Sequence, residues 1–136
     1  MDELSHSVQD YLKAIYMQTR AGGATSTVAL AEALDVRPAS VTGMLQKLAG
    51  REPPLIAYRK HQGVSLTEAG QQVALQTIRR HRLIEQFLYN VLGYPLDRVH
   101  AEAEVLEHAV SPYFVERLAH LLQQSDLGDK QRYYVT

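Results

Sequence analysis

Hydrophobic residues in the first 50 positions recur every three or four residues, which is the spacing of amphipathic helices. This spacing predicts a helix over residues 5–20, which two glycines end, and a short helix over 28–34. We expect Thr27 to cap the short helix. Pro38 then stands in the first turn of a third helix, 38–49, where proline is tolerated. The chain therefore begins with three helices.

The pattern then changes to one typical of strands. Residues 55–59 (LIAYR) and 63–67 (GVSLT) are predicted to be two strands, joined by a hairpin turn with the sequence KHQG. Two helices that are joined by a tight turn and followed by a two-stranded wing are typical of a winged helix-turn-helix domain.

Three further helices are predicted in the rest of the chain. Thr67 can cap a long helix over residues 68–92, in which Gly70 is a mild cost to helix stability. A break at Gly-Tyr-Pro precedes a helix over 96–110, and Ser-Pro starts another over 112–124. The predicted fold is therefore mainly α.

Composition narrows the possible classes of protein. The chain has 136 residues, 46% of them hydrophobic, which is enough to bury a core in one domain or two small subdomains. Cysteine is absent, so disulfides, thiolate zinc sites and cysteine nucleophiles are excluded. No apolar run reaches the roughly 20 residues that span a membrane, and the N-terminus lacks the pattern of a signal peptide. We expect a cytoplasmic protein.

Charge is divided between the two halves of the chain. Residues 37–60 contain five basic residues and one acid, whereas residues 101–129 contain six acids and one arginine. A basic first half suits nucleic acid, and an acidic second half suits a different task.

The basic half predicts a DNA-binding surface. The second helix of a helix-turn-helix lies in the major groove, where Arg37 could pair with guanine and small residues would allow close approach. Lysine and arginine elsewhere on this surface suit phosphates. The candidate DNA contacts are Thr27, Arg37, Pro38, Ala39, Ser40, Thr42, Gly43, Gln46, Lys47, Arg51, Arg59 and Lys60. A helical hairpin with solvated charges, or a winged domain that binds protein, is the alternative.

Metal-binding side chains are grouped in the acidic half. Glu104, Glu107 and His108 are three and four residues apart, which places them on one face of a helix. Carboxylates and imidazole without thiolate suit Mn²⁺, Fe²⁺, Co²⁺ or Zn²⁺. The other candidate ligands are Asp10 on the first helix, His81 and Glu85, which are four residues apart, and His100. A solvated acidic helix face is the alternative.

Five segments of the chain resemble those of a known family. DYLKAIY (10–16), LAEALDVRPASVTGMLQKL (30–48), GVSLTEAG (63–70), RHRLIEQFL (80–88) and VHAEAEVLEHAVS (99–111) carry the resemblance. The chain is similar, over about residues 7–124, to the metal-dependent transcriptional repressors that include the diphtheria toxin repressor, the iron-dependent regulators and the manganese transport regulator.

The resemblance implies an organisation and a function. It implies a winged helix-turn-helix DNA-binding domain over 1–70, an all-helical dimerisation and metal-binding domain over 71–126, and a tail over 127–136. It implies a metal-responsive repressor of manganese or iron homeostasis rather than an enzyme. In such a repressor, Mn²⁺ or Fe²⁺, with Co²⁺, Zn²⁺ or Cd²⁺ as substitutes, promotes binding of a homodimer to double-stranded operator DNA. No membrane partner is implied.

The resemblance also implies which side chains bind metal. It gives ligand roles to Asp10, His81, Glu104, Glu107 and His108, and a second site to His81, Glu85 and His100. Hard oxygen donors at positions 10 and 104 favour the manganese branch. The manganese branch usually has another acid at the position of Lys13, so one-metal and two-metal sites both stay open. Gly43 stands where a longer side chain is common, and longer members continue into an SH3-like domain beyond the position of Thr136.

Other functions stay open on the residues alone. A winged-helix regulator could sense a small organic ligand or bind DNA constitutively. Two carboxylates and a histidine could also hold a hydrolytic metal in an enzyme. A module that only binds other proteins is the remaining possibility. Binding of DNA with and without metal separates these classes.

Overall fold

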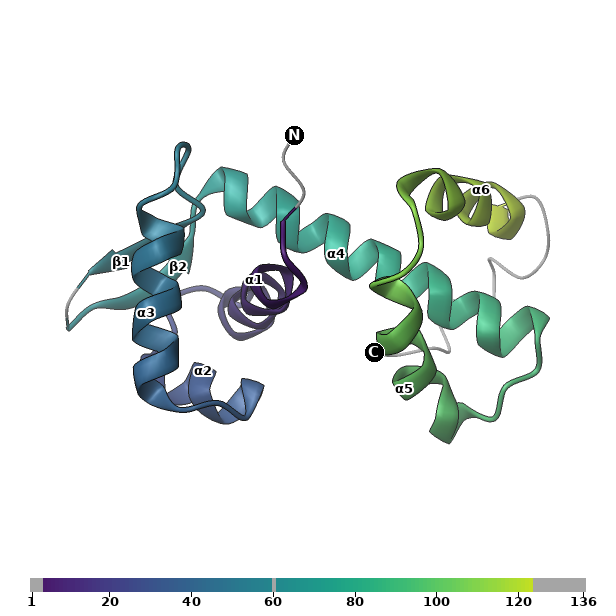
Figure 1. Cartoon of the computed structure of the whole chain (residues 1–136), viewed down its shortest axis with the longest axis horizontal. Helices are drawn as coiled ribbons and strands as arrows, with labels where there is room; N and C mark the ends of the chain where they lie inside the picture. The colour runs from purple at the N-terminus through teal and green to yellow at the C-terminus, as the bar shows by residue number, and fades with distance from the viewer. Residues whose placement is uncertain (1–3, 60, 124–136) are drawn as a thin grey trace. The chain divides into compact units, whose positions relative to one another are not determined.

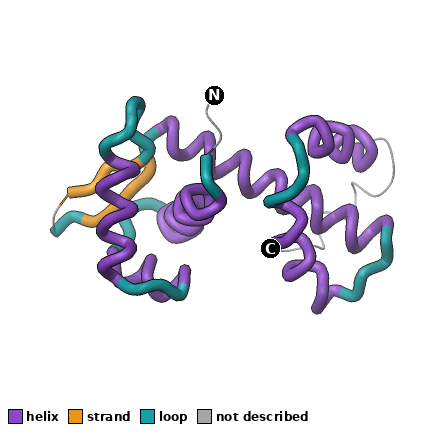
Figure 2. The backbone as a smooth tube through the Cα atoms, in the orientation of Figure 1, coloured by secondary structure: helices purple, strands orange, loops and turns teal. Residues whose placement is uncertain are grey.

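The computed structural model describes residues 4–59 and 61–123, and its elements are labelled in Figure 1 and coloured by type in Figure 2. The chain divides into two compact units, Met1–Thr77 and Ile78–Thr136. The predicted DNA contact Lys60 and the predicted tail over 127–136 lie outside the described residues. Within the described ranges, no helix is long and apolar enough to cross a membrane.

The N-terminal unit is a winged helix-turn-helix, as predicted. Its elements are α1 (His6–Thr19), α2 (Thr27–Leu34), α3 (Pro38–Ala49), β1 (Ile56–Arg59), β2 (Gly63–Leu66) and the first half of α4 (Glu68–Gln86). Ser5 caps α1 by accepting a hydrogen bond from the Val8 amide at 3.2 Å. The hydrophobic spacing and the proline at the start of α3 therefore placed these helices to within a residue or two.

The cap of α2 was predicted one residue too late. Ser26, and not Thr27, is the N-cap, because its Oγ accepts a hydrogen bond from the Ala29 amide at 3.0 Å. Both residue types can cap a helix, and the extended backbone of Ser26 decides between them. At the other end, α2 stops at Asp35, whose φ of 54° is a left-handed conformation that aspartate tolerates.

The wing is an antiparallel pair with Ile56 opposite Leu66 and Arg59 opposite Gly63. A bridge from Thr25 extends it, since the amides of Thr25 and Val64 donate to each other's carbonyls at 2.9 and 2.8 Å. Gly63 has a φ of 92°, and a Cβ there would lie 2.6 Å from the Thr25 carbonyl oxygen. Glycine at position 63 therefore allows the chain before α2 to pair with the wing.

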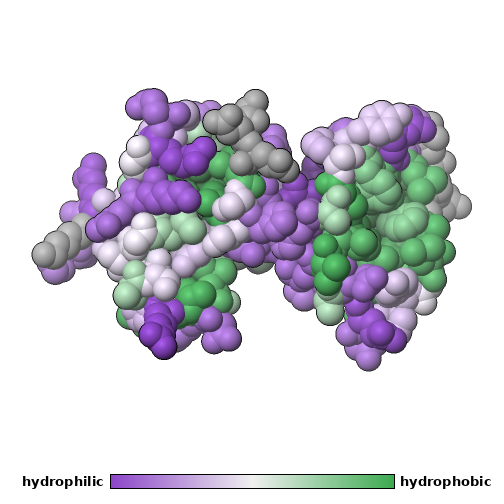
Figure 3. Space-filling model, in the orientation of Figure 1, coloured by the Kyte–Doolittle hydropathy of each residue, from purple (hydrophilic) through white to green (hydrophobic). Residues whose placement is uncertain are grey.

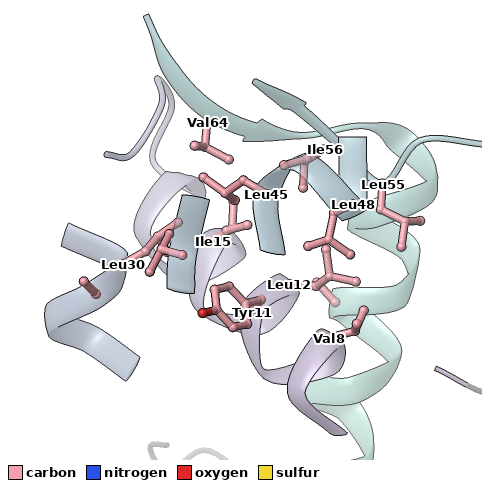
Figure 4. Close-up of a cluster of buried hydrophobic side chains, with 13 residues drawn as sticks. Val8, Tyr11, Leu12, Ile15, Leu30, Leu45, Leu48, Leu55, Ile56 and Val64 are labelled. Atoms are coloured by element: carbon pink, nitrogen blue, oxygen red, sulfur yellow. The ribbon is translucent and has the colours of Figure 1, made fainter. Parts of the chain in front are cut away.

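One hydrophobic core joins the three helices to the wing, as Figure 4 shows. Leu12, Ile15, Leu30, Leu45 and Leu48 have no exposed surface. Burial of each such side chain stabilises the fold by roughly 1.5–3 kcal/mol. This core fixes α3 and leaves the opposite face of α3 exposed.

The C-terminal unit is helical, and two of its predicted boundaries change. The remainder of α4 is followed by a π-helical turn, η1 (Phe87–Val91), within the stretch predicted as one helix over 68–92. Helix α5 (Leu96–Glu107) ends three residues before the predicted 110, because the Ala109 and Val110 amides both turn back to the Leu106 carbonyl. Helix α6 (Pro112–Gln123) completes the unit. Its core contains Ile84, Leu88, Val99, Ala103, Leu118 and Leu122.

Candidate metal centre

Helices α4 and α5 bring five of the predicted ligands together in the C-terminal unit. His81 and Glu85 come from successive turns of α4, and His100, Glu104 and Glu107 come from α5. His81, Glu85 and Glu107 are at most 3% exposed. Ionisable groups buried this deeply destabilise a fold unless they are paired or bind a cation.

Three of these side chains direct a donor atom at one another. His81 Nε2 lies 3.0 Å from Glu85 Oε2 and 3.2 Å from His100 Nδ1, and the last two atoms are 3.1 Å apart. Ligand atoms at about 2.1 Å from a transition metal are separated from each other by roughly 3.0–3.4 Å. The triangle of donor atoms therefore has the dimensions of one face of a metal coordination sphere.

The other nitrogen of the same imidazole faces a second group of carboxylates. His81 Nδ1 lies 3.2 Å from Glu107 Oε2 and 4.0 Å from Glu104 Oε1. Glu104, Glu107 and His108 each offer a ligand atom within 4.8 Å of the others. The two ring nitrogens of His81 thus face both of the ligand groups that the resemblance implied for it.

The donor atoms present fit a divalent transition metal. Two imidazoles and three carboxylates without a thiolate are a hard to borderline set, which suits Mn²⁺ and Fe²⁺. Glu85 is 1% exposed, and within the described part of the chain its second oxygen, Oε1, accepts no hydrogen bond. A buried carboxylate oxygen without a donor is expected where a cation completes the site.

Opposing effects act on the proton affinity of His81. Burial by itself lowers the pKa of the imidazole, but hydrogen bonds to Glu107 and Glu85, together with the charges of both carboxylates, outweigh it. The net effect raises the pKa of His81 to about 9. In the metal-free protein at neutral pH, the imidazolium therefore supplies the positive charge between these carboxylates.

We expect the metal-free protein to lose stability as pH rises from about 6.5 to about 9. A group whose folded pKa is raised stabilises the fold fully below its unfolded pKa, and this contribution disappears as pH passes the folded pKa. Urea unfolding of chelator-treated protein at several pH values measures the trend. A His81→Asn variant should show a flatter profile in this window, and a wild-type free energy of unfolding that rises with pH would contradict the assignment.

The two remaining predicted ligands are His108 and Asp10. His108 is the C-cap residue of α5 rather than part of the helix, because α5 ends earlier than predicted. Asp10 is half-buried on α1, in the N-terminal unit. Its role as a ligand stays a prediction from the sequence.

The predicted DNA contacts lie mostly on one exposed surface of the N-terminal unit. Arg37 is the N-cap of α3 and is exposed, and Pro38 is the first helical residue. Along α3, the exposed candidates are Ala39, Ser40, Gly43, Gln46 and Lys47. Arg59 ends β1 and is also exposed. This arrangement suits a helix that enters a major groove.

Three other candidates are less accessible. Thr42 is half-buried, and its hydroxyl donates to the Pro38 carbonyl at 3.2 Å. Thr27 is half-buried in the first turn of α2. Arg51 is half-buried and lines a cavity of about 260 Å³ with Leu55 and Val73. Sequence spacing could not distinguish these side chains from their exposed neighbours.

Sequence reasoning missed Ser26 as the residue that starts α2 and Thr25 as the residue that ties α2 to the wing. The signal for Ser26 was present, since Ser-Thr offers two candidate caps in succession. No local signal identifies Thr25, because its partner, Val64, lies 39 positions further along the chain.

Two family models match the chain, and together they cover most of it. The iron dependent repressor N-terminal DNA binding domain matches residues 3–64. The iron dependent repressor metal binding and dimerisation domain matches residues 67–127.

Individual relatives agree with these matches. The HTH-type transcriptional regulator MntR of Bacillus subtilis (strain 168) is 34% identical over 126 residues, which are 93% of this chain and 87% of that protein. The manganese regulator SloR has a solved structure that is 42% identical with a TM-score of 0.71 over 88% of this chain and 54% of that one. The structure of ScaR with bound Zn²⁺ is 39% identical, and it matches with a TM-score of 0.75 over 88% of this chain and 55% of that one.

The chain thus spans most of the length of the regulators from Bacillus and about half the length of these solved structures. The two matched domains and the relative that is 34% identical over 93% of this chain indicate the same family. The chain belongs to the iron-dependent repressor family.

Proposed function

We propose that this protein is a transcriptional repressor in which Mn²⁺ or Fe²⁺ promotes the binding of a homodimer to operator DNA. The observation that carries the proposal is the cluster in which buried His81, Glu85 and Glu107 meet the exposed His100, in a chain whose residues 3–64 match a DNA-binding domain. The relatives support the choice of metal, since SloR is a manganese regulator and ScaR has been solved with Zn²⁺ and with Cd²⁺. We propose that Co²⁺, Zn²⁺ and Cd²⁺ can substitute.

The residues of the centre would hold the metal in two groups. Glu85, His100 and one nitrogen of His81 form the first group, and Glu104, Glu107 and His108 form the second. A bound divalent cation would supply the positive charge that the His81 imidazolium supplies to these carboxylates in the metal-free protein. Because His81 must give up its proton to act as a ligand, metal binding near neutral pH should release a proton. We keep Asp10 as a further ligand on the resemblance alone.

The surface of the C-terminal unit supports a homodimer. Figure 3 shows a broad hydrophobic surface on the unit that contains α5 and α6. Grouped exposed apolar side chains mark interaction surfaces. The exposed apolar residues of η1, α6 and the adjoining turn are Tyr89, Val91, Leu92, Tyr113, Phe114 and Leu121. Ile84 and Leu88 are at most 2% exposed, so they belong to the core of the unit and not to this surface.

The exposed surface of α3 supports operator binding. In a homodimer, two copies of α3 could enter successive major grooves of double-stranded DNA. Arg37, Lys47 and Arg59 are exposed and would contact bases or phosphates there. Coupling between the metal and DNA sites must be reciprocal, so DNA should also tighten metal binding.

We expect Mn²⁺ to raise DNA affinity by about 5–150-fold, the usual range of a coupling between two sites. The probe is a duplex selected by the protein, in the presence of Mn²⁺, from a library with a randomised central segment. Its affinity is then measured by fluorescence anisotropy with Mn²⁺, with Fe²⁺ under anaerobic conditions, with Mg²⁺ and with chelator. Affinity that is the same in all four solutions would reject metal control and favour constitutive binding or an organic effector.

A further inference from the structure

Gly43 lies in the middle of α3 and has no structural reason to be glycine. Glycine inside a helix is less stable than alanine, so its presence needs an explanation. A left-handed backbone is one explanation, and the glycines with positive φ in the described chain are Gly22, Gly23, Gly63 and Gly93. Gly43 is not among them, and it lies in the regular helix Pro38–Ala49.

Close packing within the chain is the second explanation, and the geometry excludes it as well. A Cβ built on Gly43 would meet no atom within 4 Å. By contrast, a Cβ on Gly70 would lie 1.9 Å from the Leu55 carbonyl oxygen. Gly43 is therefore bare on its outer side, where only another molecule can come close.

The residues around Gly43 on the exposed face of α3 have small side chains. Ala39 and Ser40, four and three residues earlier on the same face, are exposed and small. The Thr42 hydroxyl is held against the Pro38 carbonyl by its hydrogen bond. Longer side chains, Arg37 and Lys47, stand at the two ends of the segment. The backbone of α3 is thus accessible at its centre and flanked by cations.

We propose that Gly43 is the point where α3 comes closest to the base pairs of the major groove, and that the missing side chain determines operator sequence. This inference rests on the proposed DNA-binding function. Because a longer side chain at this position would occupy part of the groove, its absence leaves room for bulky groups on the base edges, such as the thymine methyl. Glycine at position 43 therefore makes the free protein less stable but allows a closer contact between α3 and DNA.

The test compares Gly43→Ala with wild-type protein, both saturated with Mn²⁺. The alanine variant should melt about 2–4 °C higher, because a helix-interior glycine is replaced without a clash. On duplexes chosen by wild type from the randomised library, it should bind roughly tenfold or more weakly. Its own selection should yield a sequence altered at the base pairs that face the middle of α3. Ser7→Thr adds the same single carbon to an exposed residue of α1 and should change neither sequence nor affinity.

Each other result would overturn the inference. A lower melting temperature for Gly43→Ala would show that glycine serves the fold. An unchanged selected sequence, with affinity either kept or reduced equally on all duplexes, would show that position 43 does not read base pairs. If wild-type protein selects no sequence at all, the proposed function fails before Gly43 is tested. If wild type selects a sequence that Gly43→Ala shares, only the role of Gly43 fails.

Discussion

Replacing Glu107 with glutamine is expected to lower Mn²⁺ affinity by about 100-fold or more and to abolish metal-dependent DNA binding. Replacement of groups that merely support metal ligands already reduces affinity by about 10–100-fold, so loss of a charged ligand should be at least as severe. Glu107 is the best choice among the carboxylates of α5, because it is 3% exposed and lies 3.2 Å from His81 Nδ1.

Glutamine keeps the shape of Glu107 and one acceptor oxygen while it removes the charge. The fold of the C-terminal unit should therefore survive, and circular dichroism with thermal melting checks this. The same substitution removes two of the influences that raise the pKa of His81, the hydrogen bond and the charge of Glu107. The pKa of His81 should consequently fall, which NMR titration of the imidazole protons would detect independently of any metal.

Glu102→Gln is the matched control for Glu107→Gln. Glu102 lies on the same helix and is half-buried, but it accepts a hydrogen bond from the Tyr94 hydroxyl at 3.3 Å. It is not among the side chains grouped around His81. Isothermal titration with Mn²⁺ should thus separate the two variants. If Glu107→Gln binds Mn²⁺ and DNA as wild type does, or if Glu102→Gln fails equally, the centre is wrongly assigned.

The parts of the fold that depend on local sequence were predictable. The hydrophobic spacing of Leu12, Ile15, Leu45 and Leu48 identified the buried faces of α1 and α3, and all four are fully buried. Local chemistry also fixed the start of α3, where Pro38 is the first helical residue. The end of α5 was not predictable in the same way, since the helical pattern of side chains continues past Glu107 while the backbone turns back to Leu106.

The candidate centre was predictable within each helix but not across helices. A spacing of four residues placed His81 beside Glu85. The contacts of His81 with His100 and with Glu107 join positions 19 and 26 residues apart, and they depend on how α4 packs against α5. Only the resemblance to known repressors indicated that these residues bind the same metal centre. The dimensions of the donor triangle came from the structure.

Gly70, in the N-terminal unit, is another residue whose role depends on a contact with a distant part of the chain. From the sequence it was a mild cost to the stability of α4, and the structure adds a reason why glycine is needed there in spite of that cost. Thr67 ties the start of α4 to the segment that leads into β1, because its hydroxyl donates to the Pro54 carbonyl at 2.7 Å and accepts from the Gly70 amide at 3.1 Å. Position 70 is drawn so close to Leu55 that only glycine fits there.

Gly70→Ala is therefore expected to destabilise the N-terminal unit by about 2 kcal/mol. Alanine should gain up to about 1 kcal/mol from helix propensity. The clash opposes this gain, since the new Cβ would lie 1.9 Å from the Leu55 carbonyl oxygen, which is backbone and cannot rotate away. Overpacking of this kind costs about 1–3 kcal/mol or more, so the clash outweighs the propensity.

Urea unfolding measures the change, and Gly43→Ala supplies a control with the same atoms added. Both substitutions place one methyl group on a helix of the same unit, yet the surroundings differ, with nothing within 4 Å at Gly43. We expect opposite signs, with stability lost at position 70 and gained at position 43. A gain at position 70 would mean that α4 can leave the Leu55 carbonyl without loss of the packing between the wing and the helix.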